Sequence, residues 1–219
     1  MKPTQQNKLI VHWLIAVLFL SILLLVMGTW IQMTSDHKIW MLLIFVVVPI
    51  IQFLCTPIFT LTGVYTYFSP MVVAFGDTRS LLDLHNGTSY DYLLKMRKIR
   101  PGGVWKRTML VYYLEALLAI IRQMESGELS PKVAVRGSSY FLSERTATRL
   151  GFKTGSTSMA EKVNIVLNYL DLVWMYSLSE GRWVWPNLRN IKTVNIQGHD
   201  LILQKAYLSE LRDYLATRS

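Results

Sequence analysis

Residues 9–32 read LIVHWLIAVLFLSILLLVMGTWIQ, and His12 is the only ionisable side chain among them. About 20 apolar residues in a helix cross a bilayer core of roughly 30 Å, so this stretch is long enough to span a membrane. It exceeds the apolar region of about 7 to 15 residues in a cleavable signal peptide, and residues 28–30 offer no small-x-small cleavage site. The stretch therefore predicts a membrane-spanning helix that is retained.

A second uncharged segment covers residues 39–76, after the short polar stretch 33–38. Residues 39–59 are long enough for a second span, and membrane helices tolerate prolines such as Pro49 and Pro57 when neighbouring groups satisfy the freed carbonyls. We therefore expect a two-span transmembrane hairpin over residues 1–59. The remaining apolar residues, 60–76, predict a segment that lies in the membrane interface or re-enters the membrane.

The positive charge is concentrated after the hairpin. The whole chain has a net charge of +9, and residues 77–219 hold 20 Lys and Arg against 13 Asp and Glu. Six of these basic residues fall within 13 positions that contain no acid; we call them the basic segment: Lys95, Arg97, Lys98, Arg100, Lys106 and Arg107. Because basic residues are retained on the cytoplasmic side, we expect a multi-pass protein of the cell inner membrane with both termini in the cytoplasm.

Composition excludes several classes of protein. The chain is 52% hydrophobic and 17% charged, whereas soluble domains carry about 25% charged residues, so a wholly soluble or disordered chain is excluded. A single cysteine, Cys55, excludes an internal disulfide and a cysteine-based zinc site. Phosphate-binding glycine loops, dinucleotide-binding and calcium-binding patterns are missing, so we expect no cofactor and no bound metal.

Residues 77–219 predict a basic cytoplasmic domain of the α+β class, or a small α/β domain, because helical and strand patterns are mixed along the chain. Helix caps, glycine stops and apolar periodicity predict the helices, and alternating apolar residues predict the strands. Asp77 is the expected cap of the first helix, and Thr88 with Asp91 and Ser158 with Glu161 are expected capping boxes. The expected helices cover residues 77–85, 88–100, 104–126, 143–150, 158–179 and 200–217, and the expected strands cover 132–142, 182–185 and 191–196.

The turn from the expected strand 132–142 to the next helix is one candidate site. The free N–H groups and positive dipole of a helix N-terminus accept phosphate or carboxylate groups. Ser139, Ser143, Arg145 and Arg149 carry further donors there, so these residues are the candidate anion-binding set. In the simpler interpretation Ser143 only caps the helix and the two arginines are solvated.

A polar cluster directly after the membrane segment is a second candidate. His85 could transfer a proton near neutral pH if a carboxylate oriented it, and Asp83 and Asp91 are nearby in sequence. On the helix expected over 77–85, Asp83 and His85 are about 200° apart and do not pair directly, so Asp91 or Asp77 would have to reach His85 through the tertiary fold. In the simpler interpretation these are helix caps and a surface histidine.

The basic segment is the third candidate. Each Lys or Arg near an anionic leaflet contributes about 1 kcal/mol, and Trp105 within the segment could lie at the membrane interface. The same charges would suit nucleic acid, but attachment to a membrane favours lipid and makes nucleic acid an unlikely partner. A third interpretation is that these charges only set the topology.

Three functions remain open from the sequence. The first is an integral membrane protein whose basic domain binds anionic lipid headgroups or a partner protein, as an adaptor or accessory subunit, with homo-oligomers as a further possibility. The second is a membrane-embedded enzyme that acts on a lipid or polyprenyl phosphate, with His85, Asp83 or Asp91 as acid or base and Arg145 and Arg149 on the phosphate. The third is a membrane-disrupting effector with a cytosolic sensor domain.

Overall fold

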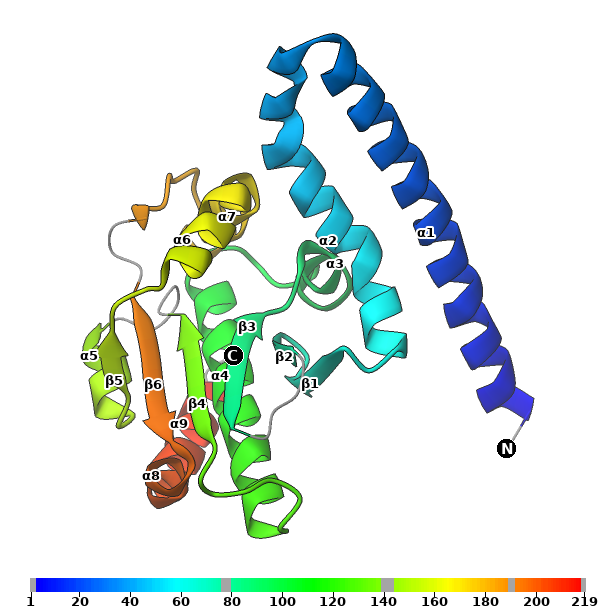
Figure 1. Cartoon of the computed structure of the whole chain (residues 1–219). Coiled ribbons are helices and arrows are strands. Elements are labelled where there is room, and N and C mark those ends of the chain that lie inside the picture. The colour runs from blue at the N-terminus through cyan, green and yellow to red at the C-terminus, as the bar shows by residue number, and fades with distance from the viewer. Residues whose placement is uncertain (1–2, 76–79, 139–143, 189–191, 218–219) are drawn as a thin grey trace.

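The structure, a computed structural model, describes residues 3–75, 80–138, 144–188 and 192–217. It begins with two long apolar helices joined by a short 3-10 helix, and these form an antiparallel pair beside a mixed α+β domain (Figure 1). The three elements of this pair, which we call the hairpin, are α1 (Pro3–Asp36), η1 (Lys38–Leu43) and α2 (Ile44–Leu61). Residues 10–36 and 38–61 are long and apolar enough to cross a membrane, with mean hydropathies of 2.8 and 2.5.

The domain is built on one six-stranded sheet with the order β1-β2-β3-β4-β6-β5. Only β3 and β4 pair in parallel, and every other neighbouring pair is antiparallel. The parallel pair is joined through the long helix α4, the crossover that parallel strands require. The strands are β1 (Tyr65–Ser69), β2 (Val72–Phe75), β3 (Leu81–Asn86), β4 (Ala134–Ser138), β5 (Lys153–Gly155) and β6 (Thr193–Gln197).

Helices cover one face of this sheet to form the main core. Alternate residues of each strand, such as Leu82 and Leu84 of β3, are buried against α4, and the neighbouring strands contribute Val135 and Ile196. Leu208 of α9 completes this layer and is fully buried. The helices that follow the hairpin are α3 (Ser89–Asp91), α4 (Gly103–Glu125), α5 (Glu144–Arg149), α6 (Met159–Leu167), α7 (Tyr169–Glu180), α8 (Gly198–Leu203) and α9 (Lys205–Ala216), with a π-helical turn η2 (Tyr92–Met96) after α3.

A second apolar cluster joins the start of α4 to η2 and α7. Trp105 lies at its centre, is 1% exposed, and stacks on Tyr92 with ring centroids 5.4 Å apart. Its methionine members are Met71, Met96, Met109 and Met175. The expectation that Trp105 lies at a membrane interface is therefore wrong, because the side chain is enclosed by this cluster.

Within the segment 60–76, the described residues 60–75 complete α2 and form two paired strands; that they lie in the membrane interface stays a prediction. After the end of α2 the segment forms the strands β1 and β2, which pair with each other and then with β3. Its backbone hydrogen bonds are therefore made within the sheet, so these residues belong to the α+β domain by their pairing. The sequence pattern obscured β2 because Val72, Val73 and Ala74 are all buried, and a strand buried on both faces has the same apolar composition as a membrane segment.

The helix expected over 77–85 is also wrong over its described part, because residues 81–86 form β3. Asp77, its expected cap, lies outside the described residues. Several later elements agree with the sequence: α4 matches the helix expected over 104–126, and α6 begins with the expected capping box of Ser158 and Glu161. The second capping box, Thr88 with Asp91, starts α3.

Two further differences concern the expected helix 158–179 and the expected strand 182–185. The helix is broken at Asn168, where α6 ends and α7 begins, and the strand is not formed. The segment after α7 instead folds back on that helix, because Ser177 Oγ accepts a hydrogen bond from Val184 N at 3.1 Å. The expected helix 200–217 is present as two helices, α8 and α9, and the short strand β5 had no counterpart among the expected elements.

Candidate functional site

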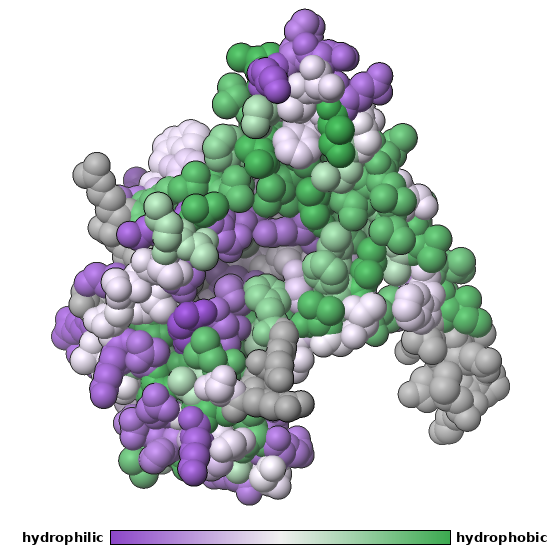
Figure 2. All heavy atoms as spheres, viewed as in Figure 1, coloured by the Kyte–Doolittle hydropathy of each residue, from purple (hydrophilic) through white to green (hydrophobic). Residues whose placement is uncertain are grey.

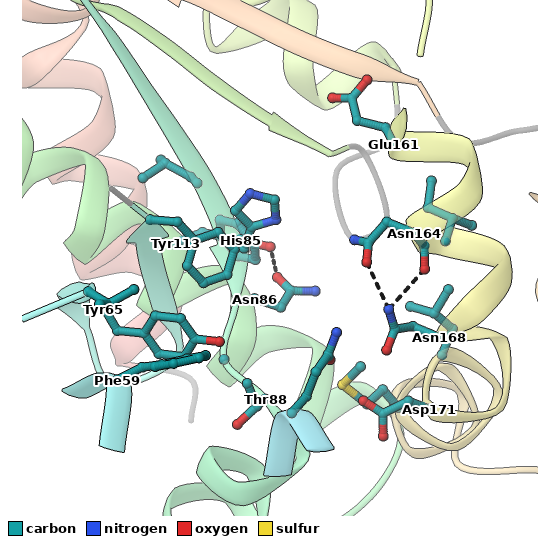
Figure 3. A pocket seen from close by; sticks show the side chains of 18 residues that line it. Phe59, Tyr65, His85, Asn86, Thr88, Tyr113, Glu161, Asn164, Asn168 and Asp171 are labelled. Atoms are coloured by element: carbon teal, nitrogen blue, oxygen red, sulfur yellow. Dashed lines mark hydrogen bonds between the residues drawn. The ribbon is translucent and has the colours of Figure 1, made fainter. Parts of the chain in front are cut away.

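A cavity of about 420 Å³ lies where the hairpin meets the domain (Figure 3). Helix α2 forms one side, the strands β1–β3 form a second, and α6 with α7 forms a third. The residues whose side chains matter most to its chemistry are Gln52, Phe59, Tyr65, Phe75, His85, Asn86, Thr88, Tyr113, Glu161, Asn164, Asn168 and Asp171. Ligand sites commonly have this volume and this mixture of apolar walls with a few polar groups.

One wall of the cavity is a continuous row of four rings, which we call the aromatic wall. Phe59 lies against Tyr65 with ring centroids 5.2 Å apart, Tyr65 lies 4.7 Å from Phe75, and Phe75 lies 4.3 Å from His85. The register of the sheet explains the row, because Tyr65 is opposite Phe75 in the antiparallel pair β1–β2. The row therefore offers an apolar surface with π faces to whatever occupies the cavity.

The opposite wall is polar and comes from α6, α7 and the residue between them; we call it the amide wall. Asn168 Nδ2 donates to the backbone oxygen and to Oδ1 of Asn164, both at 2.9 Å (Figure 3). Asn168 is 8% exposed, and its Oδ1 is buried without a hydrogen-bond partner among the described residues. Asp171 accepts a hydrogen bond from the hydroxyl of Ser89, and burial raises the pKa of its carboxyl group above the ordinary value. This wall therefore presents buried oxygen atoms that can accept hydrogen bonds.

A charged network lies above the aromatic wall on β3, β4 and α6. Arg136 Nη2 donates to Asp83 Oδ2 at 2.5 Å, and His85 Nε2 lies 3.5 Å from the same oxygen. Arg136 Nε lies 3.9 Å from Glu161 Oε1. Burial raises the pKa of Asp83, but hydrogen bonds and positive charge from His85 and Arg136 outweigh it and lower this pKa to about 2. Asp83 is therefore an ionised partner for a cation rather than a proton donor.

Asp91 does not pair with His85, so it cannot orient that histidine for proton transfer. Its carboxylate accepts hydrogen bonds from the hydroxyl of Tyr67 at 3.0 Å and from the backbone N–H of Thr88 at 2.8 Å. The Thr88 hydroxyl lies 2.7 Å from that of Thr56 in α2. Burial raises the pKa of Asp91, despite the hydrogen bonds from Thr88 and Tyr67 that lower it. Asp91 therefore joins β1, α2 and α3, which agrees with the simpler interpretation of this residue as a cap.

The two candidate anion-binding residues that the structure describes are not brought into the cavity. Arg145 and Arg149 are exposed on α5, and neither is among the residues that line the cavity. Ser139 and Ser143 lie outside the described residues. Of the described side chains that line the cavity, none is a lysine or an arginine, so the described part of this cavity does not offer the cations that a phosphate group would require.

The basic segment follows the residues that contact the hairpin. Tyr90 packs against Phe19 of α1 and Phe53 of α2, with ring centroids 6.2 Å and 5.4 Å away. Within the basic segment Arg107 is half-buried, Lys106 pairs with Glu180 at the end of α7, and the exposed members are Lys95, Arg97, Lys98, Arg100 and Lys106. Most of the positive charge of this segment is therefore available to a partner.

Sequence reasoning found His85, Asp83 and Asp91 but missed the other residues of the two walls of the cavity. The aromatic wall comes from three strands and a helix end that could be aligned only once the sheet register is known. One feature of the sequence could have indicated the amide wall: the asparagines 164 and 168 are four residues apart and therefore share a helix face. That feature lies within the single helix expected over residues 158–179.

The arrangement has limited means for catalysis or metal binding among the described residues. They contain no group of three or more His, Cys, Asp or Glu side chains that could hold a metal ion. The Asp83 carboxylate orients His85, and His85 faces the cavity, so a histidine is available for proton transfer there. Comparisons with protein-family models, with curated proteins and with solved structures found no match to this chain.

Proposed function

We propose that this protein is a membrane-anchored binding protein, an adaptor or accessory subunit, whose hairpin crosses the membrane and whose basic segment holds the α+β domain against anionic lipid headgroups. The observation that carries the proposal is the contact of Tyr90 with both apolar helices, because it places the start of the basic segment beside the hairpin. The remaining surface of the domain is then presented to a partner protein.

The exposed surface of the hairpin supports the membrane anchor. Only 6% of the most apolar window of α1 and 28% of that of the second helix are buried, whereas a core helix of a soluble protein is mostly buried. Figure 2 shows apolar surface along both helices and over the adjoining edge of the domain, where Figure 1 places α6 and α7. Exposed apolar patches of this extent are typical of surfaces that contact lipid or another protein.

The position of Tyr90 also suggests where the membrane begins. From Phe19 to Asp36, α1 has 17 residue steps, a length of about 26 Å, which is close to the roughly 30 Å of a hydrocarbon core. The contact of Tyr90 with Phe19 and Phe53 would then lie near the cytoplasmic boundary of the bilayer, and the mostly apolar residues 10–18 of α1 would continue past this boundary into the headgroup region. The basic segment follows within five residues of Tyr90, at the level where headgroups are expected.

Apolar side chains accompany the basic segment. Leu93 and Leu94, in η2 just before Lys95, are 48% and 54% exposed, which is typical of residues that enter the interface beside lysines and arginines. Gly102 N donates to Leu178 O at 2.8 Å, so the basic segment is joined to the end of α7. Beyond that end lie the exposed Trp183 and Trp185, a residue type enriched at membrane interfaces.

The proposal is tested with the full chain in nanodiscs that contain either neutral lipid alone or neutral lipid with anionic phosphatidylglycerol. We expect amide hydrogen exchange over residues 92–108 to slow in the anionic nanodiscs. A variant with Lys95, Arg97, Lys98 and Arg100 changed to Gln should lose this protection. The matched control changes the same number and kinds of exposed residue on the far side of the domain, Lys132, Arg145, Arg149 and Lys153, and should keep it.

Equal exchange in both kinds of nanodisc for the unaltered protein would contradict the lipid part of the proposal. Equal loss of protection in the variant and in the matched control would show that net charge alone is responsible, which would also contradict a specific role of the basic segment.

A further inference from the structure

We propose that the cavity between α2, β1–β3 and α6–α7 binds a small organic amine, with its ammonium group at the amide wall beside Asp171 and its hydrocarbon or ring portion against the aromatic wall. This inference goes beyond the proposed function and does not depend on it, because the cavity is formed by the folded chain whether or not the basic segment contacts lipid.

The unpaired oxygen of Asn168 is the first observation in favour of a ligand. Its Nδ2 is engaged by Asn164, and Figure 3 shows the Oδ1 turned away from Asn164 toward the cavity. Oδ1 is buried without a partner among the described residues, and a buried polar atom without a hydrogen bond destabilises the folded state. A ligand that donates a hydrogen bond at this position would remove that destabilisation.

The charge of the lining decides which donor is favoured. Asp171 has a hydroxyl partner, Ser89, but no described ion pair includes it. Glu161 is the other carboxylate of the lining, and Arg136 approaches it only to 3.9 Å. Since no lysine or arginine lines the described cavity, an ammonium group is attracted and a phosphate or carboxylate group is repelled.

The aromatic wall complements the apolar end of such a ligand. The faces of Tyr65 and Phe59 can bury its hydrocarbon portion or stack on its ring. Gln52 of α2 and Asn86 of β3 add amide groups at the margin of the cavity, and Asn86 Oδ1 already accepts from the hydroxyl of Tyr113. The two walls together fit a molecule with one charged end and one apolar end.

Such an amine could come from solution or from the ethanolamine end of a phosphatidylethanolamine headgroup whose phosphate stays outside the cavity, since α2 forms one side of the cavity. The two sources share the same recognition chemistry. They are distinguished by measuring binding in nanodiscs of phosphatidylcholine alone and in nanodiscs that also contain phosphatidylethanolamine. Weaker binding of a free amine in the second kind would indicate competition by the lipid headgroup, and equal binding would assign the cavity to a free amine.

The test uses calorimetric titration of the full chain in phosphatidylcholine nanodiscs with three probes of similar shape: 2-phenylethylamine, 2-phenylethanol and 3-phenylpropionate. We expect the amine to bind about tenfold or more tightly than the neutral alcohol, and the anion to bind most weakly. Tightest binding of the alcohol or of the anion would overturn the proposal, as would an absence of binding by the amine.

Variants that change one charge complete the test. Asp171→Asn keeps an acceptor for Ser89 and should weaken amine binding about tenfold, whereas Asn164→Asp keeps the acceptor for Asn168 and should strengthen it several-fold. Asp213→Asn removes an exposed carboxylate of α9 and should leave binding unchanged. If Asp171→Asn does not fold, the comparison of Asn164→Asp with Asp213→Asn decides the question. Unchanged affinity in Asn164→Asp would then refute the proposal.

Discussion

The Nε2 atom of His85 lies 3.5 Å from Oδ2 of Asp83, and both side chains project from the same face of β3. The pair exists because residues two apart in a strand share a face, whereas in a helix they would be about 200° apart. Arg136 is directly opposite Asp83 in the parallel pair β3–β4 and completes the network. This relationship makes the stability of the domain depend on pH.

Asp83→Asn should lower the free energy of unfolding at neutral pH by about 2 kcal/mol, the free energy that corresponds to a pKa lowered from 3.8 to about 2. Because the pKa is lower in the folded state, this stabilisation is complete above about pH 5 and is lost as the pH falls toward 2. Urea unfolding in detergent at several pH values should show the two proteins converging at low pH. The free energy of unfolding of the exposed control variant Asp213→Asn should stay close to that of the unaltered protein at every pH. A difference in free energy of unfolding between Asp83→Asn and the unaltered protein that does not change with pH would contradict the prediction.

Thr56→Val should loosen the junction between the hairpin and the domain. The variant keeps the shape of the side chain but removes the hydroxyl that lies 2.7 Å from that of Thr88, a loss of about 1 kcal/mol. Faster amide hydrogen exchange over residues 88–96 would report it. Thr62→Val removes a hydroxyl that bonds only to its own helix, so exchange over the same residues should not change. Similar exchange in both variants would mean that this hydrogen bond does not hold the junction.

Gly181→Ala should destabilise the joint between the basic segment and α7. Gly181 has a φ of 67°, and a Cβ there would lie 3.1 Å from Gly102 Cα. The expected loss is about 1 to 3 kcal/mol, from backbone strain and from the displaced contact. Gly127→Ala is the matched control, since its φ is 81° but a Cβ there meets nothing within 4 Å. Thermal unfolding measures the loss of stability in each variant, and the larger loss expected for Gly181→Ala gives the effect of the contact with Gly102. Equal losses of stability in the two variants would exclude such an effect.

Trp105 and Trp183 should respond differently to truncation. Trp105→Ala leaves a cavity at the centre of a buried cluster and should lower the free energy of unfolding by about 3 to 5 kcal/mol. Trp183 is 66% exposed, so Trp183→Ala should change the stability by less than about 1 kcal/mol. Under the proposed function Trp183→Ala should also reduce the quenching of tryptophan fluorescence by brominated lipid. Undiminished quenching in that variant would place Trp183 away from the bilayer.

The orientation of the hairpin gives a further prediction. Replacing Cys55 by Ala and introducing a cysteine at Ser35, in the exposed end of α1, should allow labelling of intact cells by a membrane-impermeant maleimide. A cysteine at Ser126, exposed after α4, should be labelled only after the cells are opened. The reverse pattern would refute cytoplasmic termini.

Much of the architecture could be predicted from local signals. The hairpin, α4 and the two capping boxes follow from apolar length, helical periodicity and paired polar side chains, and all are present. These features depend on residues within a few positions of one another, which is why a single sequence contains enough information for them.

The sheet was harder to predict because its pairing is non-local. Tyr65 contacts Phe75, and Asp83 contacts Arg136, only because the strands lie in one particular register. Strand β5, with three residues, is too short to produce an alternating pattern. The cavity depends on the same pairing and on the break at Asn168, so its two walls could not be placed before the fold was known.

The passage from α2 to β1 takes three residues, Thr62, Gly63 and Val64. So short a connection cannot act as a flexible tether, and α2 is held again at Thr56 by Thr88. If α2 spans the bilayer, a change in its tilt, such as one caused by a thinner membrane, would be transmitted directly to the sheet. The edge strand β1 and the aromatic wall lie next to α2 and would be displaced first.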